Sequence, residues 1–272
     1  MYKALEYHYL LCQKHLEEVL ECLFRFSVIE KARVRYLVDN EELRRWISSP
    51  SSDLFLINGN ETLHDRASPV SLYCGMLTRA LQSQKPRIVL YWFCGLNTDA
   101  DIAEMLGNLI GQLLDQIEAK KSPLKEIDKI WYRDFVLYDQ MVVFDLFKKI
   151  LIHQLKSAVI FCILDGVSFY EDHHRSQAFE NLVEDLTALV SEAQQSKRIF
   201  KVLFTSPIRS QSAKAVARES LQELDIPPFI DTGRSDFATS DFTNSFNRRS
   251  SINTVSGLSV YEDTFEYFDD LE

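Results

Sequence analysis

Polar segments follow the longest apolar runs of this sequence, and they are the positions at which a ligand would bind. These segments are 58–71, 95–101, 165–172 and 205–209. If the runs are parallel strands, their carboxyl ends meet at one edge of a sheet, which is where ligands bind in such sheets. Ser68 followed by Pro69 is also typical of the start of a helix, whose first N–H groups attract an anion. The sequence therefore predicts a site built from these segments, with an anion as one candidate ligand.

Other residue types that support catalysis or metal binding form no clear pattern. The segment 171–174 reads Glu-Asp-His-His, which offers four metal-binding side chains, but consecutive residues rarely converge on one ion. A solvated loop is the alternative interpretation. Neither GxSxG nor HExxH occurs, and the other histidines are isolated from one another. The five cysteines form no CxxC pair and lie in apolar surroundings, which indicates buried reduced thiols of an intracellular protein: Cys12, Cys22, Cys74, Cys94 and Cys162.

Hydrophobic periodicity predicts which elements position these residues. Helices are expected at 3–27, 40–47, 69–82, 99–121, 141–156 and 177–193. Strands are expected at 54–57, 87–94, 158–164, 200–204 and 222–226. The first four strands are apolar throughout, so helices should cover both of their faces. Alternation of strands with crossover helices favours a parallel sheet. We therefore expect an α/β fold with a three-layer, mostly parallel sheet flanked by helices.

Length and composition predict either one large globular domain or one domain with an appendage. Hydrophobic residues make up 46% and charged residues 26%, which excludes wholesale disorder. We divide the 272 residues into a helical prelude at 1–50, an α/β domain at 51–230 and a tail at 231–272. The tail contains twelve Ser and Thr residues and nine acids against three arginines. Because its few aliphatic residues cannot bury enough surface to order it, the tail is expected to be disordered.

Net charge narrows the partners and the location. The chain has 40 acidic and 30 basic residues, a net charge of −10, which argues against nucleic acid and anionic membranes as partners. The most basic stretch, 31–35, is expected to be surface charge on a helix. The first residues do not read as a secretory signal, and no apolar run approaches the roughly 20 residues of a spanning helix. An intracellular, cytoplasmic location is expected.

Five segments together resemble the NACHT-like nucleotide-binding domains of fungal STAND proteins, a class of P-loop NTPases. They are 54–59, 91–95, 108–114, 160–165 and 202–206, and the resemblance extends over roughly residues 1–228. It implies a P-loop-NTPase-like sheet and a site for ATP or GTP with Mg²⁺, in which Asp165 is the metal ligand and Ser71 supplies a hydroxyl. The residues it assigns to the nucleotide are Asn58, Gly59, Asn60, Arg66, Ser68, Ser71, Asp165 and Arg209.

The sequence departs from this family at all three catalytic elements. The family's phosphate loop reads GxxxxGK[ST], but here no glycine precedes a lysine, and Glu61 and Asp65 stand where phosphates would lie. Asp165 lacks the acids that usually follow it closely, so the alternative is that it caps the next turn. Pro207 follows Thr-Ser directly where an arginine is usual. Arg209 comes two residues late, and the alternative is a solvated loop arginine.

We therefore expect a non-catalytic pseudo-NTPase that serves as a regulatory or protein-interaction module, with weak or no nucleotide binding and no cofactor. Two alternatives to this expectation remain open. The first is a divergent NTPase that binds ATP or GTP through a non-standard loop. The second is a structural assembly subunit that uses its first helix.

A protein partner is expected on the first helix or on the tail. The first helix has an apolar stripe, which alternatively packs on the α/β core. In the tail, Ser251 follows two arginines and is a candidate phosphorylation site. The segment 260–272 interleaves aromatic and acidic residues, which predicts either a docking peptide or a solubilising tail. The partner's identity and the oligomeric state stay open.

Overall fold

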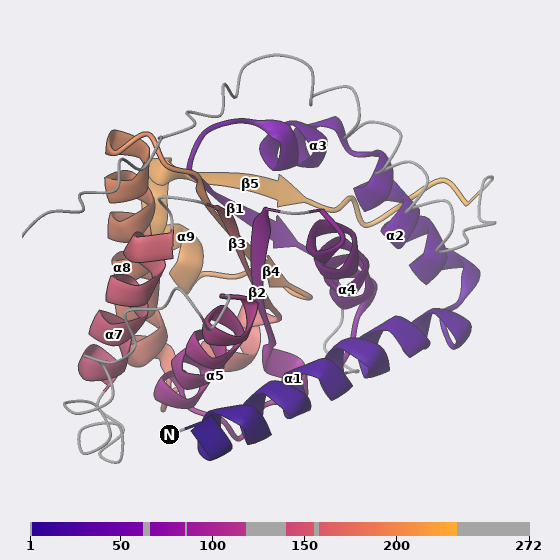
Figure 1. The fold of residues 1–272 in the computed structure, drawn as a ribbon. Helices are drawn as coiled ribbons and strands as arrows, with labels where there is room; N and C mark the ends of the chain where they lie inside the picture. Colours follow the sequence, from indigo (N-terminus) through magenta and orange to yellow (C-terminus); the bar gives the residue numbers. More distant parts are fainter. Residues whose placement is uncertain (1, 62–65, 85, 118–139, 155–157, 233–272) are drawn as a thin grey trace, which may run out of the picture.

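The computed structural model describes residues 2–61, 66–84, 86–117, 140–154 and 158–232 (Figure 1). Five parallel strands form one sheet in the order β2–β3–β4–β1–β5. The strands are β1 Asp53–Asn58, β2 Arg87–Phe93, β3 Val159–Asp165, β4 Phe200–Ser206 and β5 Leu221–Asp225. This arrangement confirms the expected α/β fold. The predictions for residues 233–272 of the tail, including the phosphorylation site at Ser251, lie outside the described residues.

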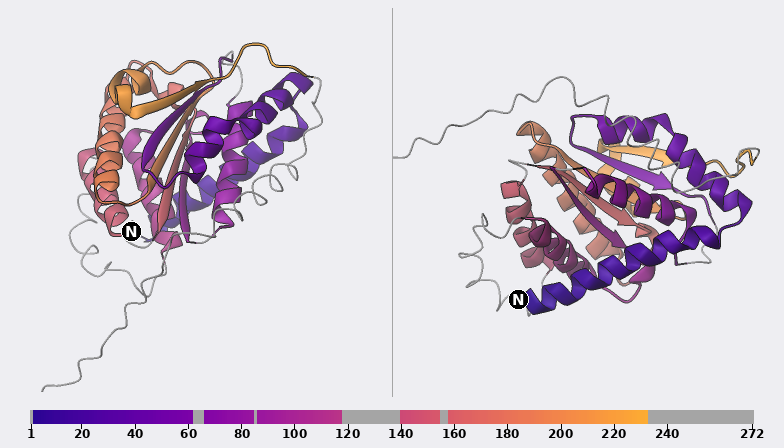
Figure 2. Two further views of the ribbon diagram at one scale, coloured as in Figure 1. Left: turned by 90° about the horizontal axis from the view of Figure 1, so that it is seen from above. Right: turned by 45° about the vertical axis from the view of Figure 1, so that its right-hand side comes forward.

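Helices cover both faces of the sheet. They are α1 Tyr2–Glu21, α2 Val28–Asp39, α3 Glu41–Ser48, α4 Pro69–Gln82, α5 Ile102–Gln116, α7 Gln140–Gln154, α8 Ser176–Gln195 and α9 Ser212–Ala217. α4 packs on one face and α8 on the other, while α1 and α2 lie on the outer side of α4 (Figures 1 and 2). Within the described ranges, none of the helices is both long and apolar enough to span a bilayer.

The helical prelude differs from the sequence prediction. One helix at 3–27 was expected, but α1 ends at Glu21 and a new helix, α2, begins at Val28. A capping box explains this start: the Ser27 hydroxyl accepts the N–H of Glu30 at 3.3 Å, and the Glu30 carboxylate accepts the N–H of Ser27 at 2.7 Å. Asn40 begins α3 as predicted, with its side chain accepting the N–H of Leu43 at 3.0 Å.

Two glutamines of α5 satisfy the outer edge of β2. The Gln112 side-chain amide accepts from the N–H of Tyr91 at 2.9 Å and donates to its carbonyl at 2.8 Å. Gln116 makes the same pair of bonds to Val89, both at 2.9 Å. These amides replace the backbone groups of a further strand, so the edge is closed to pairing with another chain.

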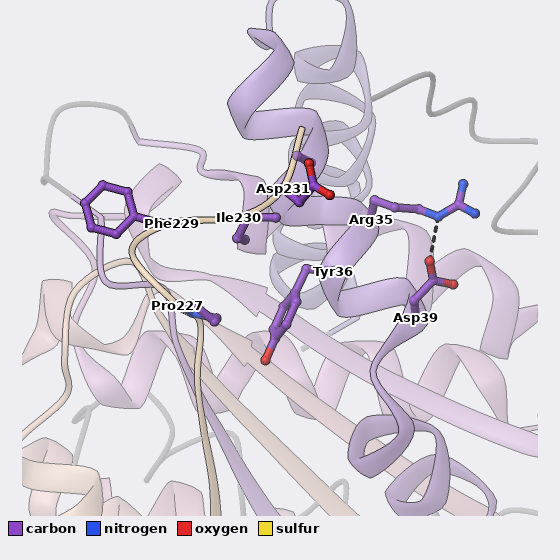
Figure 3. Close-up of a pocket in the computed structure, with 8 residues that line it drawn as sticks. Arg35, Tyr36, Asp39, Pro227, Phe229, Ile230 and Asp231 are labelled. Atoms are coloured by element: carbon purple, nitrogen blue, oxygen red, sulfur yellow. Dashed lines mark hydrogen bonds and ion pairs between the residues drawn. The ribbon is translucent and has the colours of Figure 1, made fainter. Parts of the chain in front are cut away.

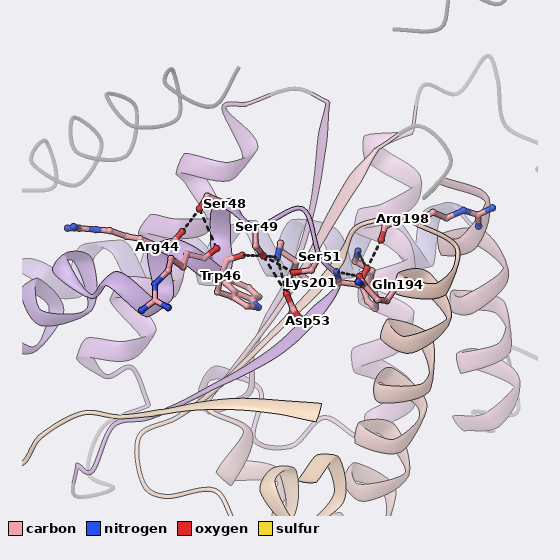
Figure 4. A network of polar contacts seen from close by, with 12 residues as sticks. Arg44, Trp46, Ser48, Ser49, Ser51, Asp53, Gln194, Arg198 and Lys201 are labelled. Carbon is pink, nitrogen blue, oxygen red and sulfur yellow. Dashed lines mark hydrogen bonds and ion pairs between the residues drawn. The ribbon is translucent and has the colours of Figure 1, made fainter. Parts of the chain in front are cut away.

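The amino edge of the sheet holds a buried polar network (Figure 4). Lys201 of β4 is 1% exposed, and its ammonium donates to the Ser49 hydroxyl at 2.8 Å. It lies 3.7 Å from the Asp53 carboxylate and 5.4 Å from the centre of the Trp46 ring. Burial lowers the pKa of Lys201 to about 8, although Asp53 acts in the opposite direction. The network contains no residue of the predicted site. It joins α3 to the sheet, because Lys201 of β4 contacts Trp46 and Ser49 at the end of α3.

Strand register brings the predicted polar residues into one row at the carboxyl edge. Asp165 pairs with Phe93, and Leu164 pairs with Phe204, so Asp165 is level with Thr205. On the next strands, Asn58 pairs with both Ser206 and Asp225. The expectation that these strand ends meet at one edge is therefore confirmed.

Candidate functional site

Asp165 is the buried centre of the carboxyl edge. Its side chain is 2% exposed, and Oδ1 accepts a hydrogen bond from the Thr205 hydroxyl at 2.5 Å. Ser71 and Cys74, both on α4, also stabilise the charged form of the carboxylate, and the Cys74 thiol donates to the Thr205 hydroxyl at 3.8 Å. The Thr205 hydroxyl in turn accepts the N–H of Gly166 at 3.3 Å. Gly166 has a φ of +74°, a conformation that favours glycine and turns the chain sharply after the strand.

Burial controls the ionisation of Asp165. It raises the pKa of the carboxyl to about 6, and the polar groups of Thr205, Ser71 and Cys74 offset only part of this effect. Hydroxyl and thiol groups thus surround a carboxylate whose charged form the fold disfavours. Such a carboxylate can hold a cation, because a cation would stabilise the charged form.

The start of α4 uses its own side chains to cap its N–H groups. The Ser68 hydroxyl accepts the N–H of Ser71 at 3.2 Å, and the Ser71 hydroxyl accepts the N–H of Ser68 at 3.0 Å. The expected helix start at Pro69 is confirmed. Because both serines are buried and bonded to each other, their N–H groups and hydroxyls already have partners within the fold. Arg66 lies just before them with an exposed side chain.

The loop after β1 continues along β4. The N–H groups of Gly59 and Glu61 donate to the carbonyls of Ser206 and Pro207, both at 2.7 Å. A Cβ on Gly59 would lie 2.7 Å from the Pro207 carbonyl oxygen, so the two segments touch backbone to backbone. Asn60 has a φ of +53° and donates through its side chain to the carbonyl of Ile226 at 2.8 Å. Two N–H groups of this loop therefore point into the sheet.

Arg33 of α2 covers the other side of this loop. Its side chain is buried, Nη2 donates to the carbonyls of Gly59 and Asn60, and Nε donates to the Glu61 carboxylate at 3.3 Å. Burial raises the pKa of Glu61 to about 7; Arg33 opposes this shift, and the charges of Asp165 and Glu30 add to it. The expectation that 31–35 is only surface charge is wrong for Arg33.

Asn58 and Arg209 face β5 and lie apart from the Asp165 cluster. The Asn58 side chain donates to Glu223 at 2.8 Å and to Asp225 at 2.9 Å, and it accepts the N–H of Ser210 at 3.1 Å. Arg209 is 59% exposed and forms ion pairs with the same two acids at 3.6 and 3.5 Å. The structure thus brings Ser68, Ser71 and Asp165 together, but directs Arg209 and Asn58 to another part of the edge.

The two acids of the segment 171–174 accept backbone N–H groups of nearby loops. Glu171 accepts the N–H groups of Gln211 and Ser212, each at 3.2 Å, before α9. Asp172 accepts the N–H groups of His174 and Arg175 at 2.8 and 3.0 Å. Among the residues that the structure describes, no group of three or more His, Cys, Asp and Glu could hold a metal ion. The contacts agree with the solvated-loop interpretation.

A separate pocket of about 580 Å³ lies between α2 and the segment after β5 (Figure 3). Its lining residues are Ala32, Arg35, Tyr36, Asp39, Pro227, Phe229, Ile230 and Asp231. Arg35 and Asp39 form an ion pair with each other at 2.7 Å on its wall. The pocket contains no residue of the predicted site.

The family model described as nephrocystin 3, N-terminal matches residues 34–207. The match runs from within α2 to the residue after β4 and includes more than half of the chain. This chain belongs to the nephrocystin 3 N-terminal family. The nephrocystin-family segment contains Gly59, Ser71 and Asp165, whereas Arg33 and Arg209 lie just outside it. No curated protein matches the chain.

Sequence reasoning missed the part that Arg33 plays. The available signal was the capping box at Ser27 and Glu30, because a helix that starts there turns position 33 toward the buried side together with Ala32 and Leu37. Glu61 was recognised as a charge in the loop, but its partner was not. The resemblance to NACHT-like domains stays a prediction, since the family match concerns the nephrocystin domain.

Proposed function

We propose that this nephrocystin-family chain is a NACHT-like domain that no longer hydrolyses nucleotide and serves as a regulatory or protein-interaction module. The observation that carries the proposal is the loop after β1, where a P-loop protein would hold phosphates. Its N–H groups at Gly59 and Glu61 donate to β4, and its carbonyls accept from Arg33. In the described part of this loop, the N–H groups of Gly59 and Glu61 are used within the fold and are not available to a phosphate.

A triphosphate does not fit these residues. A phosphate-binding loop turns successive N–H groups toward the ligand and adds a lysine. Here the loop presents carbonyl oxygens and the Glu61 carboxylate to Arg33, which lies beside them on α2. The predicted arginine, Arg209, is held by Glu223 and Asp225. Arg66 is exposed and remains a possible phosphate contact.

One observation favours the second candidate, a divergent NTPase. P-loop NTPases hold Mg²⁺ with a serine or threonine hydroxyl and an aspartate. Ser71 stabilises the charged form of the Asp165 carboxylate, so one hydroxyl and one carboxylate near each other could serve as such a donor pair. This pair supplies a possible metal contact without a phosphate cradle, which is why we place this candidate second.

Calorimetric titration of the full chain with ATP, ADP and GTP, each with and without Mg²⁺, tests the proposal. We expect no binding heat and no thermal stabilisation at millimolar nucleotide, because a ligand that binds the folded state raises its stability. A micromolar dissociation constant that is lost in Asp165→Asn would overturn the proposal and support the NTPase. Phosphate release by the wild type, absent in the same variant, would establish hydrolysis.

Exposed apolar residues on the prelude support the interaction part of the proposal. Phe24 is 86% exposed, and Val28 and Ile29, at the start of α2, are 54% and 59% exposed. Leu16 of α1 is instead buried in the core, so its replacement would test folding rather than assembly. The assembly alternative is tested by sedimentation of wild type and Phe24→Glu: an oligomer that dissociates in the variant supports it, and a monomer in both excludes it at the concentration used.

A further inference from the structure

Arg33 reaches the site from outside the α/β domain. It lies in the middle of α2, one position before the family-matched segment, and is 6% exposed. Its guanidinium bonds three consecutive residues of the loop after β1: the carbonyls of Gly59 and Asn60 through Nη2, and the carboxylate of Glu61 through Nε at 3.3 Å. A planar guanidinium is suited to such a set of acceptors, because its donors are fixed in a fork.

The loop is held from its opposite side by β4. The N–H groups of Gly59 and Glu61 bond the carbonyls of Ser206 and Pro207. The close approach of Gly59 to Pro207 leaves no room for a side chain there. The N–H groups of Gly59 and Glu61 are therefore bonded to the end of β4 and the residue after it. Acceptors of Gly59, Asn60 and Glu61 are bonded to α2 through Arg33.

We propose that Arg33 is an internal ligand of this loop: it fixes the carbonyls of Gly59 and Asn60 and the Glu61 carboxylate in one conformation, and it fastens α2 to the carboxyl edge without nucleotide. This inference rests on the proposed function, because a loop held from within the chain needs no nucleotide to order it. α1 makes a second contact of this kind, since the Asn97 amide nitrogen, in the loop after β2, lies 3.2 Å from Nδ1 of the buried His15. Two helices of the prelude, α1 and α2, thus touch loops that follow strands.

The charges around Arg33 explain why it occupies this place. Glu61 is its ion-pair partner, and the charges of Glu30 and Asp165 also act on Glu61. Removal of Arg33 would leave the Glu61 carboxylate without its cation and under the influence of two further acids, which favours keeping the arginine in position. The packing of Ala32, Val34 and Leu37 holds α2 against α4, while Arg33 connects α2 to the loop.

Hydrogen–deuterium exchange of the full chain tests the inference, with Arg33→Met compared with Arg35→Met. Arg35 is two positions along the same helix and pairs with Asp39 at the surface, so its variant controls for loss of an arginine from α2. We expect amides at 57–61 to exchange at least tenfold faster in Arg33→Met, with β3 and α8 unchanged. Arg35→Met should match the wild type at 57–61.

Equal exchange at 57–61 in the two variants would overturn the inference. If Arg33→Met fails to fold, Arg33→Lys decides, because one ammonium cannot serve two carbonyls and Glu61 in the same geometry. We expect at least threefold faster exchange of 57–61 in that variant, and unchanged exchange refutes the role. Protection of the wild-type loop by ATP and Mg²⁺ would instead refute the proposed function, and it is read independently of the arginine variants.

Discussion

Replacing Asp165 by asparagine is expected to stabilise the protein at pH 7.5. The carboxyl is 2% exposed, and its contacts are the hydroxyls of Thr205 and Ser71 and the thiol of Cys74. An asparagine keeps an oxygen that accepts from Thr205. Its amide group can donate to the Ser71 hydroxyl, so the substitution removes a charge while leaving the neighbours with partners.

The magnitude follows from the raised pKa of Asp165, which is about 6 in the folded chain against an ordinary value of 3.8. Because the folded pKa is the higher one, the carboxyl's contribution is fully favourable below pH 3.8 and is lost as the pH rises to 6. Two pKa units correspond to about 3 kcal/mol. We expect Asp165→Asn to gain about 1–3 kcal/mol over the wild type at pH 7.5 and little or nothing at pH 4.

Urea unfolding of wild type and variant at several pH values between 4 and 8 measures this difference. Asp115→Asn is the control, since Asp115 is exposed on α5 and tests the amide substitution as such. A variant that is less stable than the wild type at pH 7.5, with Asp115→Asn neutral, would refute the reasoning. We expect no cation to bind at Asp165, so millimolar Mg²⁺ with ATP should leave the stability difference unchanged. A bound cation would stabilise the charged carboxylate of the wild type and reverse the sign of the difference.

Three further substitutions test other contacts by urea unfolding at pH 7. Gly59→Ala should lose about 1–3 kcal/mol of stability, because its Cβ would meet the Pro207 backbone oxygen at 2.7 Å. Gly75→Ala is the control and should be near neutral, because the atoms that its Cβ would meet first are side-chain atoms of Val19 and Leu20. Equal losses in the two variants would contradict this account. Gln112→Leu should lose about 2–4 kcal/mol of stability, because it removes the two side-chain bonds to the N–H and C=O of Tyr91. Gln116 is only half-buried, so Gln116→Leu should lose less. The reverse order of losses would contradict this explanation. Lys201→Met should stay within about 1 kcal/mol of the wild type, since Asp53 is 26% exposed and can be hydrated, whereas a loss above about 2 kcal/mol would show that the ion pair is strongly stabilising.

The strands and the helix at Pro69 could be predicted because local signals agree with the tertiary structure there. The largely apolar runs that form β1, β3 and β4 are buried except for the first residues of β1 and β3, so pattern and burial coincide. Ser68 and Pro69 give the start of α4 to the residue. The prediction failed at α2 and α9. The predicted first helix ends at Ser27, so the capping box that starts α2 there is missed, and α9, with six residues, is too short to show a periodic pattern.

The site could be predicted as a row of strand ends but not as a set of contacts. Parallel strands place Asp165, Thr205 and Asn58 at one edge whatever their side chains do. Whether Arg209 turns toward Asp165 or toward Glu223 depends on the path of its loop, and whether Arg33 faces solvent depends on how α2 packs on α4. These are tertiary properties, which residue spacing does not determine.

Charge at the carboxyl edge links the proposed loss of nucleotide binding to the position of Arg33. Asp165 and Glu61 are buried acids with pKa values raised to about 6 and about 7, and the charge of Asp165 adds to the shift of Glu61. A phosphate entering beside them would add repulsion of about 3 kcal/mol per pair of charges 5 Å apart at an effective dielectric constant near 20. Relief would require Arg33 to leave Glu61, which would in turn leave a buried carboxylate without its cation. The arginine that fastens α2 to the loop is therefore the same charge that a phosphate would need, and the fold can supply it to one of them.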